Sequence, residues 1–236
     1  EDSDIIVNLV GILFEKKRND FVEIHFNFVK RLVDNIKLYK KKFIQVSALG
    51  VNKSNDSLYS KSKNQADIYI EKNLEKFSII RPSLIFGPED NFFNKFAQMT
   101  LISPFLPLIA GGKTKFQPIY VEDVSKGIVA ILKKDIKNKI FEFGGPDIFS
   151  FKELLQILLI VLNRKRLLMY IPKRAAVLLA KFFQLLPNPL LTEDQIKLLE
   201  NDNVVLDTNY TFKYLGISPV SLKLIIPDYL KRFKKY

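Results

Sequence analysis

Tyr59 and Lys63 form a Tyr-x-x-x-Lys pattern in a segment with helical character. Residues four apart lie on one face of a helix, so the phenol and the ammonium are expected to point the same way. A tyrosine hydroxyl has an ordinary pKa near ~10. A neighbouring ammonium favours the phenolate and moves that pKa toward the working range. Such a tyrosine can protonate a carbonyl oxygen while a nicotinamide delivers hydride to the carbonyl carbon.

Ser47 supplies a second hydroxyl at the end of an apolar segment, twelve residues before Tyr59. Ligands of parallel sheets bind beyond the carboxyl ends of the strands, so Ser47 stands where a second donor is needed. The predicted catalytic set is therefore Ser47, Tyr59 and Lys63. The Tyr-x-x-x-Lys pattern alone also fits an ordinary exposed helix turn. It gains weight from Ser47 before it and from the strand that carries Arg81-Pro82 after it.

The segments that must position these residues alternate between two periodicities. Apolar runs predict strands, the first of them buried and parallel, and helical spacing predicts helices between them. This alternation predicts an α/β fold with a Rossmann-like parallel sheet and right-handed crossovers. The expected strands are 5–11, 43–47, 77–82, 116–121 and 140–146, and the expected helices are 21–40, 58–74, 91–101 and 122–133. Glu122 and Asp123 are interpreted as helix-start residues favoured by the helix dipole, not as an acid–base pair.

The character of the sequence changes after Ser150. Ser150 and Glu153 have the spacing of a capping box at the start of a helix. Thr192 marks another helix start, and a helix is expected over 173–186. The segment 173–191 is strongly apolar with scattered basic residues. It fits a core-packed helix and a surface that docks on a hydrophobic partner or membrane equally well.

Composition limits the classes of function. The net charge of +12 can indicate affinity for nucleic acid or another anionic surface. The basic residues are scattered and lack a nucleic-acid-binding motif, so we expect no specific nucleic-acid partner. The absence of cysteine excludes disulfides and thiolate ligands, and a single histidine, His25, argues against zinc, so no metal is expected. We interpret His25 as a packing residue of the first helix.

Several segments, taken in order, resemble the extended and atypical short-chain dehydrogenases/reductases. They are Asn-Leu-Val-Gly at 8–11, Val-Ser-Ala-Leu-Gly at 46–50, Tyr-Ser-Lys-Ser-Lys at 59–63, the segment from Arg81 to Asp90, and the V-x-D-V-like segment at 117–124. A narrower resemblance is to the NAD(P)H-binding accessory subunit of respiratory complex I and its bacterial relatives. It is carried by residues 87–96, 107–124 and 191–199.

This resemblance implies a partial NAD(P)-binding Rossmann domain over 1–149 and a mostly helical substrate or partner lobe over 150–236. The implied cofactor is NAD(P)H, with NADPH slightly favoured, and the implied contacts are Leu9, Val10, Gly11, Tyr59, Lys63, Pro82, Ser83 and Ile85. The family opens with a strand, Gly-x-x-Gly-x-x-Gly and a helix that hold the pyrophosphate. Here Gly11 is the first glycine and Gly50 the next. We therefore expect the chain to start at the fourth strand, with Ile5–Val10 as an exposed apolar edge.

The resemblance favours an accessory or assembly subunit associated with NADH:quinone oxidoreductase, complex I. The expected partners are complex I subunits, and the expected location is cytoplasmic, with peripheral contact on the inner face of the membrane through 173–191. The alternative is an NAD(P)-dependent oxidoreductase or sugar-nucleotide epimerase that uses Tyr59 as acid and base. The sequence leaves both open, because Tyr59 and Lys63 also serve ribose binding alone.

Overall fold

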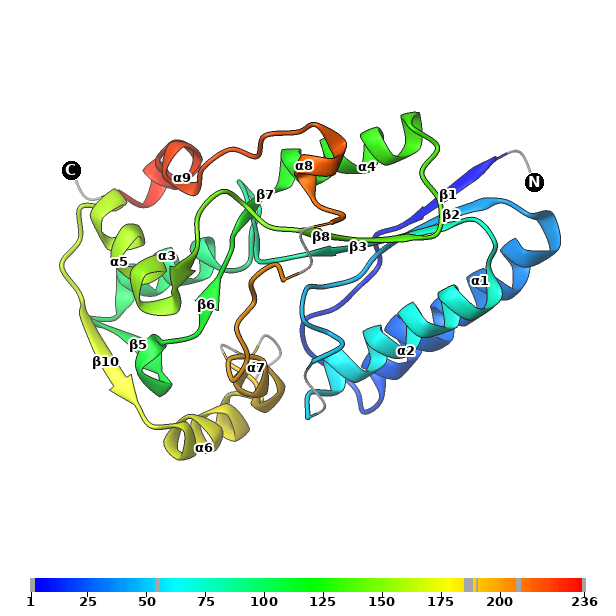
Figure 1. The fold of residues 1–236 in the computed structure, drawn as a ribbon. Helices are drawn as coiled ribbons and strands as arrows, with labels where there is room; N and C mark the ends of the chain where they lie inside the picture. Colours follow the sequence, from blue (N-terminus) through cyan, green and yellow to red (C-terminus); the bar gives the residue numbers. More distant parts are fainter. Residues whose placement is uncertain (1–2, 54–55, 185–188, 190, 207–208, 235–236) are drawn as a thin grey trace.

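A four-stranded parallel sheet forms one half of the molecule (Figure 1). The computed structural model describes residues 3–53, 56–184, 189, 191–206 and 209–234. The sheet has the order β1-β2-β3-β8, and each pairing is parallel. Its strands are β1 (Ile5–Asn8), β2 (Lys42–Val46), β3 (Phe77–Pro82) and β8 (Lys139–Phe143). The predicted Rossmann-like α/β class is confirmed.

Helices cover both faces of this sheet (Figure 1). One face carries α2 (Leu58–Asn73) and α1 (Phe28–Tyr39), which follows a π-helical turn at Val22–Asn27, and the other carries α4 (Val121–Lys133) and α8 (Phe212–Leu215). Successive strand residues point to opposite faces. Phe43 therefore packs under α1 and α2, while its neighbour Ile44 packs with α4 and α8.

Strand β1 lies at the edge of the sheet. Within the described residues it pairs with β2 alone. Ile5 is 39% exposed and Val7 is 37% exposed, so the strand is not buried as its composition suggested. The exposed apolar edge expected at Ile5–Val10 is present.

The other half of the molecule is built from helices and three two-stranded sheets. Its core is formed by α3, α5 and α9, with Phe93, Leu154 and Ile226 at its centre. The helices are α3 (Phe93–Ile102), α5 (Phe151–Val161), α6 (Lys173–Phe183), α7 (Glu193–Leu198) and α9 (Leu222–Leu230), with short 3₁₀ turns at Ala110–Gly112 and Lys231–Phe233. The strand pairs are β4 (Ile85–Phe86) with β7 (Ile119–Tyr120), β5 (Phe105–Ile109) with β10 (Leu167–Ile171), and β6 (Lys115–Phe116) with β9 (Phe149–Ser150).

The prediction of one strand over 116–121 is wrong. The segment contains the end of β6 and all of β7, which belong to different sheets. Pro118 lies between them and has no amide hydrogen to donate to a ladder. Val121, the last residue of the expected strand, already begins α4. Glu122 and Asp123 stand in the first turn of that helix, as expected.

The helix starts predicted at Ser150 and Thr192 are confirmed by the structure. Ser150 Oγ accepts from Glu153 N at 3.2 Å, and the Glu153 carboxylate accepts from Ser150 N at 2.7 Å, so the capping box is confirmed. Thr192 begins α7 in the same way. Helix α6 ends at Phe183, and the expected end at Leu186 lies outside the described residues.

The chain passes between the two halves more than once. Strands β5 and β6 pair with β10 and β9 from beyond residue 148, and α8 returns to the large sheet, where Phe212 stacks on Phe143. The division at residue 150 stays a prediction. In the part of the chain that the structure describes, no helix is long and apolar enough to cross a membrane.

Candidate functional site

One face of α2 carries Tyr59, Lys63 and Asp67, each four residues after the last. Lys63 is 7% exposed and Asp67 is 0% exposed, while Tyr59 is half-buried. The helix begins at Ser57, whose hydroxyl accepts from the backbone N–H of Ser60. The structure thus brings the two predicted residues together and adds a buried carboxylate that the prediction missed. Asp67 follows Lys63 by four residues, and this spacing in the sequence already indicated that the two side chains share one helix face.

Asp67 ties α2 to the sheet. Its Oδ2 accepts from Nε and Nη2 of Arg81 on β3, each at 2.9 Å, and from Ser47 Oγ at 3.0 Å. Asp67 Oδ1 is buried and has no hydrogen-bond partner among the described residues. The predicted Ser47 is thus in the site, but its hydroxyl is engaged by this carboxylate.

Burial dominates the titration of the two charged groups on α2. It raises the pKa of Asp67 from 3.8 to about 6, and this outweighs the opposite effects of Arg81 and Ser47. Burial also lowers the pKa of Lys63 from 10.5 to about 8, against the attraction of Asp67. Desolvation disfavours the charged form of each group, and this moves both pKa values toward neutral pH.

The expectation that Lys63 lowers the pKa of Tyr59 is wrong for this arrangement. Burial raises the pKa of Tyr59, and the carboxylates of Asp67 and Asp194 raise it further. The ammonium of Lys63 lies 5.6 Å from the centre of the Tyr59 ring and donates to the carbonyl of Val46 at 3.4 Å. The phenol therefore stays protonated.

His25 links the loop after β1 to the start of α2. Its Nε2 accepts from the backbone N–H of Ile12 at 3.1 Å, and its Nδ1 lies 3.0 Å from Ser62 Oγ. Ser62 in turn donates to the carbonyl of Tyr59 at 3.0 Å. Burial, followed by the charge of Lys63, lowers the pKa of His25 to about 3. The ring is therefore neutral and holds the Tyr59 turn in place, with Phe21 stacked on it.

A cavity of about 1110 Å³ opens between the two halves at the carboxyl ends of the strands. It is lined by seven of the predicted residues, namely Leu9, Ser47, Tyr59, Lys63, Pro82, Ser83 and Ile85. Val10 and Gly11 lie outside its lining. A Cβ placed on Gly11 would be 3.4 Å from Lys63 Nζ, so Gly11 lies directly against that ammonium.

Ser83 is held by a segment that sequence analysis did not connect to it. Its hydroxyl contacts both the backbone carbonyl and the side-chain oxygen of Asn203, at 2.9 and 2.6 Å. The side-chain amide of Asn203 donates to the carbonyl of Leu49 at 2.9 Å. Asn203 therefore joins the loops after β2 and β3 at one side of the cavity.

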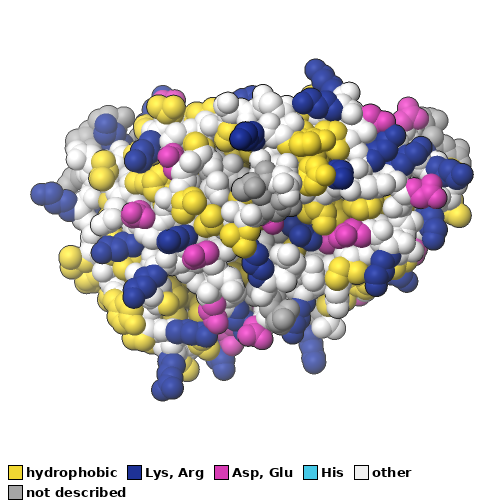
Figure 2. Space-filling view, viewed as in Figure 1, with side chains coloured by type: hydrophobic (Ala, Val, Ile, Leu, Met, Phe, Trp, Pro, Cys, Tyr) yellow, Lys and Arg dark blue, Asp and Glu magenta, His cyan; other side chains and the backbone are white. Residues whose placement is uncertain are grey.

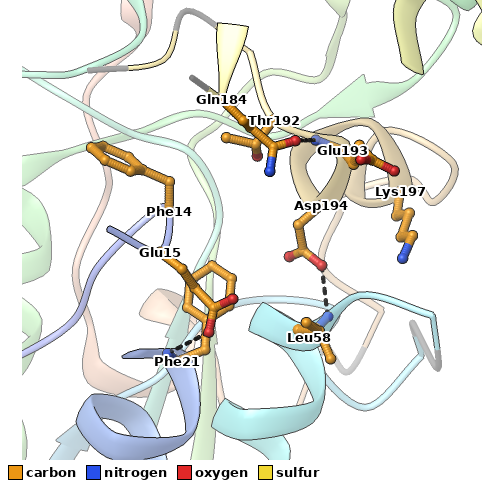
Figure 3. A pocket seen from close by; sticks show the side chains of 9 residues that line it. All are labelled: Phe14, Glu15, Phe21, Leu58, Gln184, Thr192, Glu193, Asp194 and Lys197. Atoms are coloured by element: carbon orange, nitrogen blue, oxygen red, sulfur yellow. Dashed lines mark hydrogen bonds between the residues drawn. The ribbon is translucent and has the colours of Figure 1, made fainter. Parts of the chain in front are cut away.

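Asp194 of α7 caps α2 from the other half of the molecule. Its carboxylate accepts from the backbone N–H groups of Leu58 and Tyr59, at 2.7 and 3.1 Å, and from Ser57 Oγ at 2.8 Å. Figure 3 shows this carboxylate reaching from α7 to the backbone of Leu58. Both residues line a smaller pocket of about 230 Å³. A negative charge at a helix N-terminus is favourable because the first N–H groups of a helix lack partners within it.

Comparison with known proteins shows which proteins this chain is similar to. No protein-family model matches the chain. It is 31% identical over 246 residues to the mitochondrial NADH dehydrogenase [ubiquinone] 1 alpha subcomplex subunit 9 of Arabidopsis thaliana, covering 99% of this chain and 61% of that protein. The same subunit of Mus musculus is 30% identical, with coverages of 100% and 63%. The chain thus spans about three fifths of the length of these relatives.

Solved structures with the same fold include two sugar-nucleotide enzymes. A UDP-glucuronic acid 4-epimerase from Bacillus cereus matches 98% of this chain and 76% of its own, with a TM-score of 0.72 and 20% identity. A dTDP-glucose 4,6-dehydratase from Streptomyces venezuelae matches 98% and 72%, with a TM-score of 0.70 and 19% identity. The chain has the extended short-chain dehydrogenase fold and is similar to the 1 alpha subcomplex subunit 9 proteins. At this level of identity the solved structures establish the fold of this subunit 9-like chain and leave its chemistry to its own residues.

The raised pKa of Asp67 predicts how stability depends on pH. Between pH 3.8 and about 6 the folded chain keeps a proton on Asp67 that the unfolded chain has lost. The contribution of this group to the free energy of unfolding therefore falls as pH rises through that window and is constant above it. In Asp67→Asn the contribution is absent, so the wild-type stability relative to the variant should decline over the window in urea unfolding experiments.

The control for this measurement is Asp56→Asn, which removes an exposed carboxylate outside the network. The wild-type stability relative to Asp56→Asn should not decline between pH 3.8 and about 6. A wild-type stability that rises with pH relative to Asp67→Asn would contradict this prediction, because it would mean that Arg81 holds the pKa of Asp67 below its ordinary value.

The capping contact of Asp194 predicts a loss of stability on truncation. Asp194→Ala leaves the first N–H groups of α2 without their acceptor, and loss of a helix cap costs about 0.5–2 kcal/mol. Thermal unfolding of Glu193→Ala, which removes the adjacent acidic residue in the first turn of α7, provides the matched control. Equal losses in the two variants would show that Asp194 acts only on α7 and not on α2.

Proposed function

We propose that the protein is an NAD(P)H-binding accessory or assembly subunit associated with NADH:quinone oxidoreductase, complex I. The observation that carries this proposal is the similarity to subunit 9 of that complex, which extends over 99% of the chain. The relatives are longer than this chain, so their partners are assigned to it here by analogy.

The corner of the cavity near Lys63 fits the nicotinamide ribose of a dinucleotide. Tyr59 and Lys63 offer a hydroxyl and an ammonium from one helix face, and Gly11 leaves backbone without a side chain against that ammonium. In this proposal Leu9, Val10 and Gly11 pass beneath the cofactor, and Pro82, Ser83 and Ile85 lie beside the nicotinamide. Several solved structures with this fold are described as complexes with NAD. The bound cofactor would supply hydride-transfer chemistry, and NADPH is our slightly favoured form.

The electrostatics of the site support a binding role over catalysis. The pKa of Tyr59 is raised, and Ser47 donates its hydroxyl to Asp67. A general acid–base works best with a pKa near the operating pH, and Tyr59 in this setting lies far from it. The alternative of an oxidoreductase or epimerase is supported by the convergence of Ser47, Tyr59 and Lys63 on one cavity. Turnover that is lost in Tyr59→Phe would favour that alternative.

Peripheral attachment to the inner face of a membrane forms the second part of the proposal. Helix α6 presents Leu178 and Phe182, which are 70% and 66% exposed, together with exposed Lys173 and Lys181. An apolar helix face flanked by basic residues suits the boundary between headgroups and acyl chains. The expected contact segment is 173–191, of which residues 185–188 and 190 lie outside the described part of the chain.

Cofactor binding should depend on Lys63. In the full-length protein, Lys63→Met removes the ammonium that would bind the ribose, and a hydrogen bond to a charged group contributes about 1.5–3 kcal/mol. We expect NADPH affinity, measured by nucleotide fluorescence, to fall by about tenfold or more. Lys61→Met changes an exposed lysine of the same helix and should bind normally. Equal affinity of all three proteins would remove Lys63 from the cofactor site.

Association with complex I can be tested by purification. The tagged full-length protein, isolated from gently detergent-solubilised membranes, should be recovered together with complex I subunits. Recovery of the protein by itself in the soluble fraction would contradict the accessory-subunit proposal and favour a free oxidoreductase.

A further inference from the structure

The far end of the cavity differs in chemistry from its Lys63 corner. Beyond Ser47, Tyr59 and Lys63, the lining is dominated by aliphatic and aromatic side chains from the half of the molecule that contains α3, α5 and α7. They include Phe96, Met99, Ile109, Phe151, Ile171 and Leu198. A volume of about 1110 Å³ slightly exceeds the range of ~300–1,000 Å³ that small-molecule sites occupy. The cavity has room for more than a nicotinamide ribose.

The charges around this cavity are unsuited to a sugar nucleotide. Phosphate groups are bound by arginine and lysine through charge-assisted hydrogen bonds. No described arginine lines the cavity, and carboxylates outnumber cations there. The lining lysines are Lys63 and Lys95, and the lining carboxylates are those of Glu89, Asp90, Glu122 and Asp202. The ammonium of Lys95 donates to the carbonyl of Pro189 at 2.9 Å. A diphosphate beyond the Lys63 corner would therefore meet net negative charge.

The apolar end of the cavity opens at an apolar surface. Phe105, Met169 and Leu179 line the cavity and are also 42%, 47% and 40% exposed, so they form a rim. Other apolar side chains of β10 and α6, which do not line the cavity, are also highly exposed: Tyr170 (62%), Leu178 (70%) and Phe182 (66%). In Figure 2 apolar side chains gather with basic ones at the lower left, over these two elements. Exposed apolar patches of this kind mark contacts with apolar ligands or surfaces.

We infer that this cavity binds the long hydrocarbon chain of an amphiphile with an uncharged carbonyl or hydroxyl head, the head lying toward Tyr59 and Ser47. This inference deepens the proposed function and rests on it for the nicotinamide end of the same site. The hydrocarbon chain of the ligand enters across the rim at Met169 and lies along the apolar lining. The ligand is thus drawn from an apolar phase, in contrast to the sugar nucleotides bound by solved proteins of the same fold.

The test uses the full-length protein with two probes of the same head chemistry, hexadecan-1-ol and geranylgeraniol, and with UDP-glucuronic acid as the polar competitor. Binding is measured by native mass spectrometry and calorimetry, with and without NADPH. We expect at least one of the two alcohols to bind and UDP-glucuronic acid not to bind. A preference between the alcohols distinguishes a straight acyl-type chain from an isoprenoid, and either supports the inference.

Two variant pairs locate the site. Met99→Trp fills the apolar end and should weaken alcohol binding by about tenfold or more, whereas Gln98→Trp, at an exposed position of the same helix, should not. Met169→Lys charges the rim, and Leu167→Lys charges an exposed position of the same strand outside the cavity lining. Met169→Lys keeps the test decisive if Met99→Trp fails to fold.

Nucleotide binding in the same samples separates this inference from the proposed function. If NADPH binds but neither alcohol does, or if both variants of a pair bind the alcohol equally, the inference is overturned and the proposed function stands. If the alcohols bind with the expected variant pattern and NADPH does not, the cavity assignment stands and the proposed function falls. Binding of UDP-glucuronic acid in place of the alcohols overturns the inference.

Discussion

The carboxylate of Asp67 lies on α2 with no exposed surface, and a charge buried in this way is tolerated only with paired and hydrogen-bonded partners. Arg81 supplies two N–H groups and Ser47 a hydroxyl. These partners come from β3 and from the end of β2, so their contacts with Asp67 fix the position of α2 against the sheet. Tyr59 and Lys63 share the same helix face, and their place at the cavity follows from this constraint.

A second set of contacts ties the opposite half of the molecule to the same helix. Asp194 caps α2 from α7, and Asn203 holds Ser83 and the carbonyl of Leu49. Both residues belong to a segment that follows the apolar helix α6 in the chain. Helix α7 therefore contacts both α6, which carries the surface that we propose for a membrane, and α2, which carries the site that we propose for a cofactor.

Sharing a fold with sugar-nucleotide enzymes does not decide which ligand a protein takes. In this chain the sheet end of the cavity keeps the side chains that suit a nicotinamide ribose, while its lobe end is apolar and bears few cations. Tyr59 sits between these two environments, beside two carboxylates that raise its pKa. The arrangement is better suited to holding molecules than to moving protons.

The sequence by itself determined most of the helices and strands, because these depend on residues close together in the chain. Apolar periodicity predicted the sheet and its helices, and side-chain capping predicted the start of α5. The spacing of Tyr59 and Lys63 likewise predicted a shared helix face. Tertiary structure decided those features of the site that depend on contacts between residues far apart in the chain. Asp194 and Asn203 reach the site only through folding, and the pKa of Tyr59 is set by burial and by carboxylates, not by its sequence neighbour Lys63. Desolvation and long-range contacts leave no periodic signal in a sequence, which is why only the fold revealed them.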